Sequence, residues 1–259
     1  MSALRRIAPV VVPPVVAAAV GLALWEGVAR GLAIPTYLLP PPSAVAGAAF
    51  HDVGALASAC LTTGFAAVAG FVASAFVGVA VAILLASSRV VERGLYPYAV
   101  VLQTVPIVAI APLLVLWFGA GTRAVAAAAF IVSVFPVITN ALAGIRAVDP
   151  TLRDLFKLHG ASRTQVLFKL ELPHAAPQIA TGLRIACGLA VIGSIVGEFV
   201  AGFSDSPGLG IVVMTSYRQL RTDLLFAAVG CSALLGIALF GVVSGLASLA
   251  LRRWYVGAR

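Results

Sequence analysis

The sequence predicts an all-α integral membrane protein with six transmembrane helices. Of its residues, 61% are hydrophobic and only 10% are charged, and the mean hydropathy is +1.09. Soluble domains are typically about 45–50% apolar and about 25% charged, so a soluble fold could not bury this much apolar surface. The apolar residues also come in blocks of about 18 or more, the length that crosses a bilayer as a helix.

The six blocks follow one another along the whole chain. The first comes after Arg5 and Arg6 and lacks a small-residue cleavage site, so we expect a retained span rather than a signal peptide. Its Pro13-Pro14 pair is expected to kink the helix or delay its start, because proline lacks an amide hydrogen. The predicted spans are about 7–28, 56–86, 96–118, 124–145, 173–200 and 224–251.

The segments between the blocks have their own signals. A Pro-rich loop covers 34–42, and Ser43 is expected to cap a short surface helix that reaches Phe50. A loop at 204–208 and a short helix are expected before the sixth span. In the second span, small residues predict close packing against neighbouring helices: Gly64, Gly70, Ser74 and Gly78. We therefore expect a first helix and loop (1–55), a five-helix core (56–251) and a tail (252–259).

The distribution of Lys and Arg predicts the orientation of the chain. Six spans put both termini on one side, and the loops on that side hold thirteen of the basic residues, against four in the opposite loops. Loops rich in Lys and Arg stay in the cytoplasm. We therefore expect cytoplasmic termini, and the net charge of +8 reflects topology rather than an anionic ligand.

The hydrophilic interval 146–171 predicts a cytoplasmic helix–turn–helix. Asp149 can cap a first helix with Pro150 in its first turn, and Gly160 can end it. Ser162 is then expected to cap a second helix that runs through Leu170. Periodicity leaves two alternatives open: an amphipathic element lying on the headgroups, or a docking element for a cytoplasmic partner.

Prolines and polar residues within the third and fourth spans indicate a path through the membrane. Pro106, Pro112 and Pro136 free backbone carbonyls, which is tolerable where protein or a wet cavity satisfies them. Polar side chains in the same spans are costly in lipid, so some are predicted to line the path: Gln103, Thr104, Ser133, Thr139 and Asn140. Packing kinks and hydrogen bonds between helices remain equally good explanations.

Glu198 stands out as a charge near the end of the fifth span. At about 1.5 Å per residue it should lie near the outer headgroups. We expect either a role at an outer gate or receptor contact, an interfacial anchor, or an ion pair with Arg218 or Arg221. Glu26, near the end of the first span, is expected to be structural.

Several functions find no support in the residues. There is no catalytic constellation, and the three histidines and three cysteines lack metal-ligand spacing. No basic stripe with interleaved aromatics suggests nucleic acid. No phosphate-binding G-x4-G-K-[ST] loop occurs, so this chain is not predicted to bind ATP itself.

The interval 154–173 resembles the signature of the inner-membrane permeases of binding-protein-dependent ABC importers. That signature, E-A-A-x3-G-x9-I-x-L-P, is similar to Asp154-Leu155-Phe156, Gly160, Leu170 and Leu172-Pro173, with both spacings kept. Asp-Leu-Phe stands in place of Glu-Ala-Ala. Four further segments resemble the subgroup that handles aliphatic sulfonates, taurine, nitrate, thiamin pyrimidines or riboflavin-like compounds: 39–43, 104–106, 116–119 and 144–150.

The resemblance implies the type I importer permease fold in a bacterial inner membrane. It implies that two copies of the chain pair, and that each docks a coupling helix on a separate ATP-binding subunit, which holds ATP and Mg. An extracytoplasmic binding protein would deliver the substrate. The implied coupling residues are Arg153, Asp154, Leu155, Phe156, Lys157, Leu158, Gly160, Ala161, Arg163, Leu170, Leu172 and Pro173. The predicted path or gate residues are Gln103, Thr104, Pro106, Ser133, Asn140 and Glu198.

Two other classes of function compete with this interpretation. A secondary transporter driven by an ion gradient would show related halves and several buried acids or bases. A membrane-embedded enzyme would need paired acids, or a nucleophile with a base, at mid-membrane depth. Neither pattern is evident in the residues.

Overall fold

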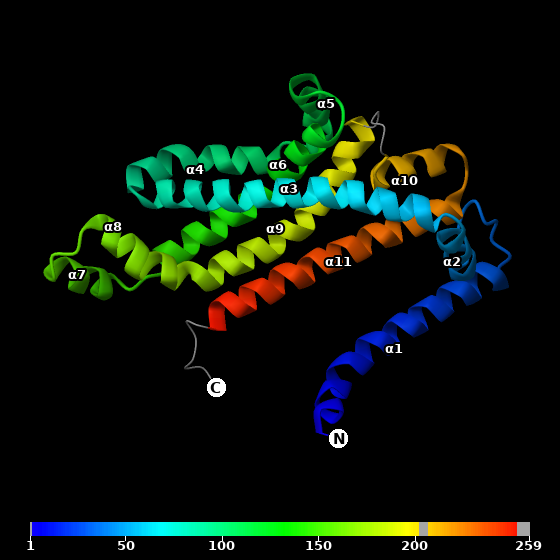
Figure 1. Ribbon diagram of the computed structural model, residues 1–259, viewed down its shortest axis with the longest axis horizontal. Helices are drawn as coiled ribbons and strands as arrows, with labels where there is room; N and C mark the ends of the chain where they lie inside the picture. The colour runs from blue at the N-terminus through cyan, green and yellow to red at the C-terminus, as the bar shows by residue number, and fades with distance from the viewer. Residues whose placement is uncertain (1, 202–206, 253–259) are drawn as a thin grey trace. The chain divides into compact units, whose positions relative to one another are not determined.

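The structure is a computed structural model that describes residues 2–201 and 207–252, with side chains from Val12 onward. Within those ranges the chain is helical and contains no β-strand (Figure 1). The helices are α1 (Ser2–Gly31), α2 (Pro42–His51), α3 (Val53–Ala86), α4 (Arg89–Thr104), α5 (Ile107–Phe118), α6 (Thr122–Arg146), α7 (Pro150–Leu158), α8 (Arg163–Val166), a π-helical turn (Leu167–Glu171), α9 (Leu172–Ala201), α10 (Leu209–Arg218) and α11 (Thr222–Arg252).

Five of the predicted spans correspond to single helices that are long and apolar enough to cross a membrane. They are Val12–Gly31, Val53–Ala86, Thr122–Arg146, Arg163–Ala201 and Thr222–Arg252. The first helix runs through Pro13 and Pro14 instead of starting after them. The predicted loop residues 204–206 and tail residues 253–259 lie outside the described residues.

The third predicted span is not continuous, which corrects the sequence-based expectation. It is formed by α4 and α5, which meet at an angle of 98° and together count as a sixth, broken span. The break falls at Pro106, which has no amide hydrogen to continue the helix. Val105 before it is extended, with φ −74° and ψ 125°, as the residue preceding a proline prefers.

The chain divides into two compact units. The first comprises residues 1–57 and 212–230, and the second comprises 58–211 and 231–259. In the first unit, Arg221 pairs with Asp52 at 2.6 Å, and the hydroxyl of Thr222 donates to the carbonyl of Tyr37. These contacts join α2 and the Pro-rich loop to the start of α11.

Ser43 does not cap α2 as predicted. The helix begins at Pro42, and Pro41 provides the N-cap without a side-chain hydrogen bond. The backbone amide and the hydroxyl of Ser43 both donate to the carboxylate of Glu26 instead. A carboxylate from α1 therefore satisfies a free amide of α2, and this contact gives Glu26 the structural role that the sequence suggested.

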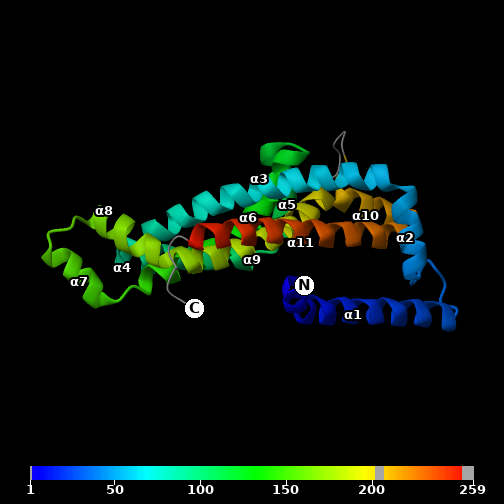
Figure 2. The same ribbon diagram turned by 60° about the horizontal axis from the view of Figure 1, so that its bottom comes forward.

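The core of the second unit is the pair α6 and α9, which lie side by side along most of their length (Figures 1 and 2). Small residues make this contact possible: a Cβ added at Gly182 or Gly193 would stand 2.9 Å from atoms of α6. Helix α3 approaches α6 as closely, as the sequence predicted. A Cβ at Gly70 would stand 2.5 Å from the Cβ of Ala129, and one at Gly78 would stand 2.7 Å from that of Val137.

Replacing Gly70 with leucine should therefore destabilise the protein severely. The new side chain would have to displace the backbone of α6. Overpacking costs about 1–3 kcal/mol, and a clash with backbone places this variant at the upper end of that range. Gly241→Leu is the matched control, because a Cβ there meets nothing within 4 Å. Thermal unfolding in detergent should show a large drop for Gly70→Leu and little change for Gly241→Leu; equal midpoints would contradict the close packing.

Candidate functional site

The predicted helix–turn–helix follows α6 and precedes α9 in the chain, and it lies at one end of the second unit (Figures 1 and 2). Helix α7 begins as predicted, with the carboxylate of Asp149 accepting the backbone amide of Thr151 at 2.8 Å and Pro150 in the first turn. The amide and then the hydroxyl of Thr151 hold the pKa of Asp149 below its ordinary value. The cap is thus formed at neutral pH and is lost as pH falls through that lowered pKa.

Gly160 forms the turn that follows α7. Its φ is +69°, a conformation that residues with a Cβ rarely adopt, and its amide donates to the carbonyl of Lys157. The amide of Ala161 reaches back to the carbonyl of Phe156 at 3.0 Å, which closes the helix end. The prediction that Gly160 ends the first helix is confirmed.

The second helix starts at the predicted cap but does not end where expected. Ser162 and Gln165 form a reciprocal capping box at the start of α8. The helix does not end at Leu170. Instead, α8 continues through the π-helical turn into α9, which gives one helical stretch, Arg163–Ala201. Since no glycine or proline stands between Arg163 and Leu172, nothing local interrupts the backbone. Residues 163–171 are therefore a direct extension of the helix that forms the fifth predicted span.

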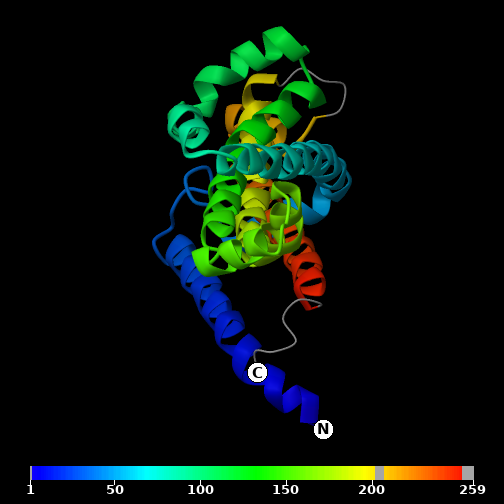
Figure 3. The ribbon, with the colours of Figure 1, turned by 90° about the vertical axis from the view of Figure 1, so that its left-hand side faces the viewer.

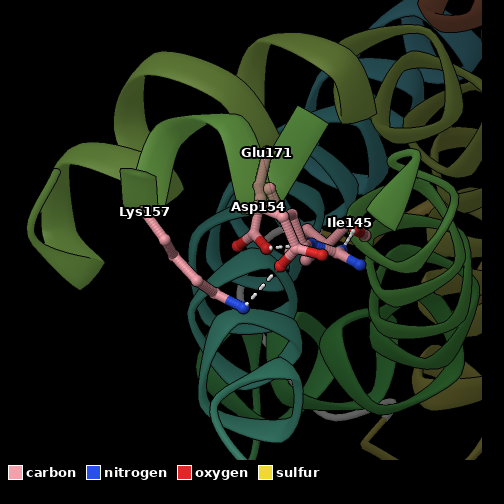
Figure 4. Close-up of polar contacts among 5 residues, drawn as sticks. Ile145, Asp154, Lys157 and Glu171 are labelled. Atoms are coloured by element: carbon pink, nitrogen blue, oxygen red, sulfur yellow. Dashed lines mark hydrogen bonds and ion pairs between the residues drawn. The ribbon is translucent and has the colours of Figure 1, made fainter. Parts of the chain in front are cut away.

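Arg153 connects α7 to both helices that enter the membrane. Its Nε donates to Glu171 at 2.8 Å, and its Nη2 donates to the carbonyl of Ile145 at 2.6 Å (Figure 4). Glu171 belongs to the π-helical turn before α9, and Ile145 lies in the last turn of α6. The Arg153 and Glu171 side chains are only 23% and 19% exposed. One side chain therefore fixes α7 to the ends of α6 and α9.

The outer face of α7 is apolar and uncovered. Leu155 is 48% exposed and Leu158 is 84% exposed, whereas Phe156 is half-buried. A cleft between α7 and α8 is lined by Leu155, Phe156, His159, Ala161, Gln165 and Lys169. Lys157 pairs with Asp154 at 3.0 Å on the exposed side of the helix (Figure 4). The element thus presents apolar side chains and a charged rim. Figure 3 views the ribbon from the side on which α7 and α8 lie in Figure 1.

The remaining predicted coupling residues lie at the joint with the membrane helix. Arg163 is the first residue of α8, Leu170 is in the π-helical turn, and Leu172 and Pro173 begin α9. Arg163 shares a second cleft with Arg153, Lys157 and Ala161. The twelve residues proposed from the signature therefore fall on one continuous element.

Three of the predicted path residues meet at the break between α4 and α5. Gln103, Thr104 and Pro106 line one cleft with Phe135 and Pro136 of α6. The hydroxyl of Thr104 donates to the carbonyl of Val101 within α4. The broken span therefore opens a cleft against α6, and its wall is mainly apolar with the amide of Gln103 as a polar group.

The polar side chains of α6 bond to their own helix. Ser133 is fully buried and donates to the carbonyl of Ala129 at 2.7 Å, while Thr139 donates to the carbonyl of Phe135. The amide of Asn140 donates to the carbonyl of Pro136 at 2.8 Å. These bonds run within a helix rather than between helices, and neither Ser133 nor Asn140 lines the cleft at the break.

Glu198 is buried in the second unit and does not line the cleft at the α4–α5 break. It is 3% exposed, and its carboxylate accepts the hydroxyl of Thr63 at 2.7 Å and the amide of Gly210 at 2.6 Å. The amide of Leu209 in turn donates to Thr63. Arg221 pairs with Asp52 rather than with Glu198. Glu198 therefore joins α3, α9 and the start of α10, a role that the sequence did not reveal.

The family of this chain follows from comparison with known proteins. A family model described as "Binding-protein-dependent transport system inner membrane component" matches residues 74–256. The riboflavin transport system permease protein of Chloroflexus aurantiacus is 34% identical over 90% of this chain and 86% of that protein. The formylaminopyrimidine transport permease protein of Halalkalibacterium halodurans is 32% identical over 89% of this chain and 91% of that protein.

The fold also has a solved counterpart. The crystal structure of an amino acid ABC transporter with histidines superposes with a TM-score of 0.59 at 21% identity, over 79% of this chain and 96% of that chain. The chain belongs to the family of binding-protein-dependent transport system inner membrane components. The predicted family, the all-α type I permease fold and the assignment as a transport subunit rather than an enzyme are confirmed.

Proposed function

We propose that this chain is the permease subunit of an ATP-driven importer, coupled to a separate ATPase through residues 149–171. The substrate is a small organic or anionic nutrient delivered by an extracytoplasmic binding protein. One observation carries the proposal: α7 exposes Leu155 and Leu158, while Arg153 ties the same helix to α6 and α9. A partner that moves α7 would therefore move two membrane helices with it.

The docking alternative suits this element better than a helix lying on headgroups. The capped ends, the Gly160 turn and the Arg153 bridge hold α7 in a defined orientation. Apolar side chains surrounded by charges are typical of a protein interface with a dry centre and polar rim. Leu155, Phe156 and Leu158 supply the apolar contact, and Lys157 and Arg163 steer the approach. Arg153, which the sequence placed with them, is engaged in the bridge to Glu171 and Ile145.

The complex proposed around this chain contains a second copy of it, two ATP-binding subunits, a binding protein and the bilayer. ATP and Mg bind to the partner ATPase, because this chain has no phosphate-binding loop. Both termini and the 149–171 segment face the cytoplasm of a bacterium whose inner membrane holds the complex. The excess of Lys and Arg in the loops of that side supports this orientation.

Docking predicts that Leu158→Glu abolishes capture of the ATPase. Loss of a hot-spot residue at the centre of an interface costs about 2 kcal/mol or more, which weakens binding more than tenfold. Leu220→Glu is the matched control, since this leucine is 71% exposed in the turn between α10 and α11. Co-expression with the ATP-binding subunit and pull-down from detergent should retain ATPase with Leu220→Glu only. Equal capture by both variants would contradict the proposal.

We propose that the translocation path of the substrate runs through the cleft at the α4–α5 break. The relatives above are named for transport of riboflavin and formylaminopyrimidine, so we propose a nitrogen heterocycle as the substrate class. Gln103 offers both a donor and an acceptor to such a ring, and Phe135 offers a stacking surface.

Gln103→Ala should lower transport in reconstituted vesicles about tenfold, because one hydrogen bond to a desolvated polar substrate is lost. ATPase capture should be unchanged. Thr139→Ala, which removes a hydroxyl bonded only to carbonyls of α6, should transport normally. Normal transport by Gln103→Ala would remove the cleft from the path.

A further inference from the structure

Three arginines line one cleft where α4 begins and α6 ends. Arg89 and Arg93 come from α4 and Arg146 from α6, and the rest of the wall is formed by Glu92, Tyr96 and Pro97. None of these residues takes part in the α7–α8 element or in the cleft at the α4–α5 break. The cleft nevertheless lies just before Asp149, where α7 starts.

The charges in this cleft do not balance. Glu92 accepts from Nη2 of Arg146 at 2.5 Å, which neutralises one positive charge. Among the side chains that the structure describes, in residues 12–201 and 207–252, neither Arg89 nor Arg93 has an ion-pair partner. Nε of Arg146 is buried there without a hydrogen-bond partner. The cleft therefore carries an excess of two positive charges and a donor that lacks an acceptor.

The position of the two arginines on α4 makes this imbalance mildly unfavourable, by about 0.2–0.5 kcal/mol for a like-charge pair. Arg89 and Arg93 are four residues apart, so they lie on one face of the helix, where like charges destabilise it. An anion between them would offset that repulsion. A phosphate group suits the site because its oxygens accept from several guanidinium groups at once.

The surroundings of the cleft indicate lipid. Helix α4 has no buried residue, and Leu95, Tyr98 and Val101 are exposed along it. Tyr96 packs partly buried against the apolar cluster that includes Leu85 and Leu142, and so stands between the arginines and the apolar part of the helix. Tyrosine is enriched at the boundary between headgroups and acyl chains, so Tyr96 suits a position at that boundary.

We propose that the cleft of Arg89, Arg93 and Arg146 binds a phosphate group, supplied by the headgroup of an anionic lipid. Arg89 and Arg93 contact the phosphate oxygens, and Nε of Arg146 donates from the floor of the cleft. The acyl chains lie along the exposed apolar side of α4. The bound lipid ties the start of α4 to the end of α6, next to the base of α7. The lipid lies in the cytoplasmic leaflet, and only this choice of leaflet rests on the proposed function.

Thermal unfolding of the purified chain without any ATPase tests this site. Short-chain phosphatidylglycerol should raise the unfolding midpoint at concentrations where phosphatidylcholine has no effect, because a ligand of the folded state stabilises it. The apparent Kd should weaken about fivefold in Arg93→Gln, the value expected for one basic residue near an anionic surface. Arg123→Gln, an exposed arginine at the opposite end of α6, should bind as tightly as the wild type.

Two further measurements distinguish a lipid headgroup from free phosphate and control for misfolding of the variants. Inorganic phosphate that raises the midpoint as much as the lipid would identify a free phosphate as the ligand and overturn the lipid assignment. Arg93→Lys keeps the charge and should retain most of the binding, so loss in Arg93→Gln alone is not a folding defect. Equal weakening by Arg93→Gln and Arg123→Gln, or no response to either anion, would overturn the site. A normal ATPase pull-down with failed lipid binding would leave the proposed function intact.

Discussion

Replacing Arg153 with methionine is expected to uncouple ATP hydrolysis from transport. The variant keeps the apolar stem of the side chain but loses the bonds to Glu171 and to the carbonyl of Ile145. Hydrogen bonds to a charged group contribute about 1.5–3 kcal/mol each, and the carboxylate of Glu171 is left largely buried without its partner. Transport should therefore fall tenfold or more. ATPase capture should persist, because the apolar face of α7 is intact.

Lys157→Met is the control for that experiment. Its ion pair with Asp154 has both side chains about two-thirds exposed, at 68% and 67%, and exposed pairs contribute at most about 1 kcal/mol. Transport per ATP hydrolysed, measured in vesicles with the full complex, should fall at most about fivefold. A loss that matches that of Arg153→Met would show that charge on α7, and not the bridge to α6 and α9, governs coupling.

Glu198→Ala is expected to have the second large effect, on stability. Its carboxylate is the acceptor for the hydroxyl of Thr63 and the amide of Gly210, and the whole group is buried. Leaving buried donors without an acceptor costs about 1–3 kcal/mol each. We expect the free energy of unfolding to fall by about 3 kcal/mol or more, seen as a lower midpoint in detergent. Glu198→Gln keeps an acceptor oxygen and should fall in between.

Ser133→Ala provides the comparison for Glu198. This hydroxyl is equally buried, but it donates only to carbonyls of its own helix, which already accept backbone amides. Its removal leaves no donor unsatisfied and should cost less than about 1 kcal/mol. If the two variants unfolded at the same midpoint, the Glu198 cluster would not hold α3, α9 and α10 together.

Features set by neighbouring residues could be predicted from the sequence, whereas features set by distant partners could not. The Asp149 cap, the Gly160 turn and the Ser162 cap each depend on a few adjacent residues. Glu198 and Thr63 are 135 positions apart, so no local pattern reveals their bond. The bridge from Arg153 to Glu171 likewise requires the turn at Gly160 to fold the chain back. Ser43 shows the same limit, because a carboxylate from α1 overrides a plausible cap.

The bend at Pro106 has a sequence signal, the proline itself, but this signal does not distinguish a kinked span from a broken one. The composition of residues 96–118 fits one span, and hydropathy alone does not distinguish a straight helix from a broken one. Because Pro106 lacks an amide hydrogen, it frees a backbone carbonyl, which makes it a candidate path residue, and the same property ends α4 at Thr104. The π-helical turn before α9 had no such marker. The sequence from Arg163 to Leu172 contains neither glycine nor proline.

The most direct test of the coupling role is a cysteine placed at Leu158, with Cys60, Cys187 and Cys231 replaced by serine. In the assembled complex, Leu158→Cys should cross-link to a cysteine on the ATP-binding subunit, and the yield should change with ATP. In intact cells a membrane-impermeant thiol reagent should not reach it. Labelling from outside the cell, or failure to cross-link at every position tried on the ATPase, would contradict the proposal that α7 transmits the work of ATP hydrolysis.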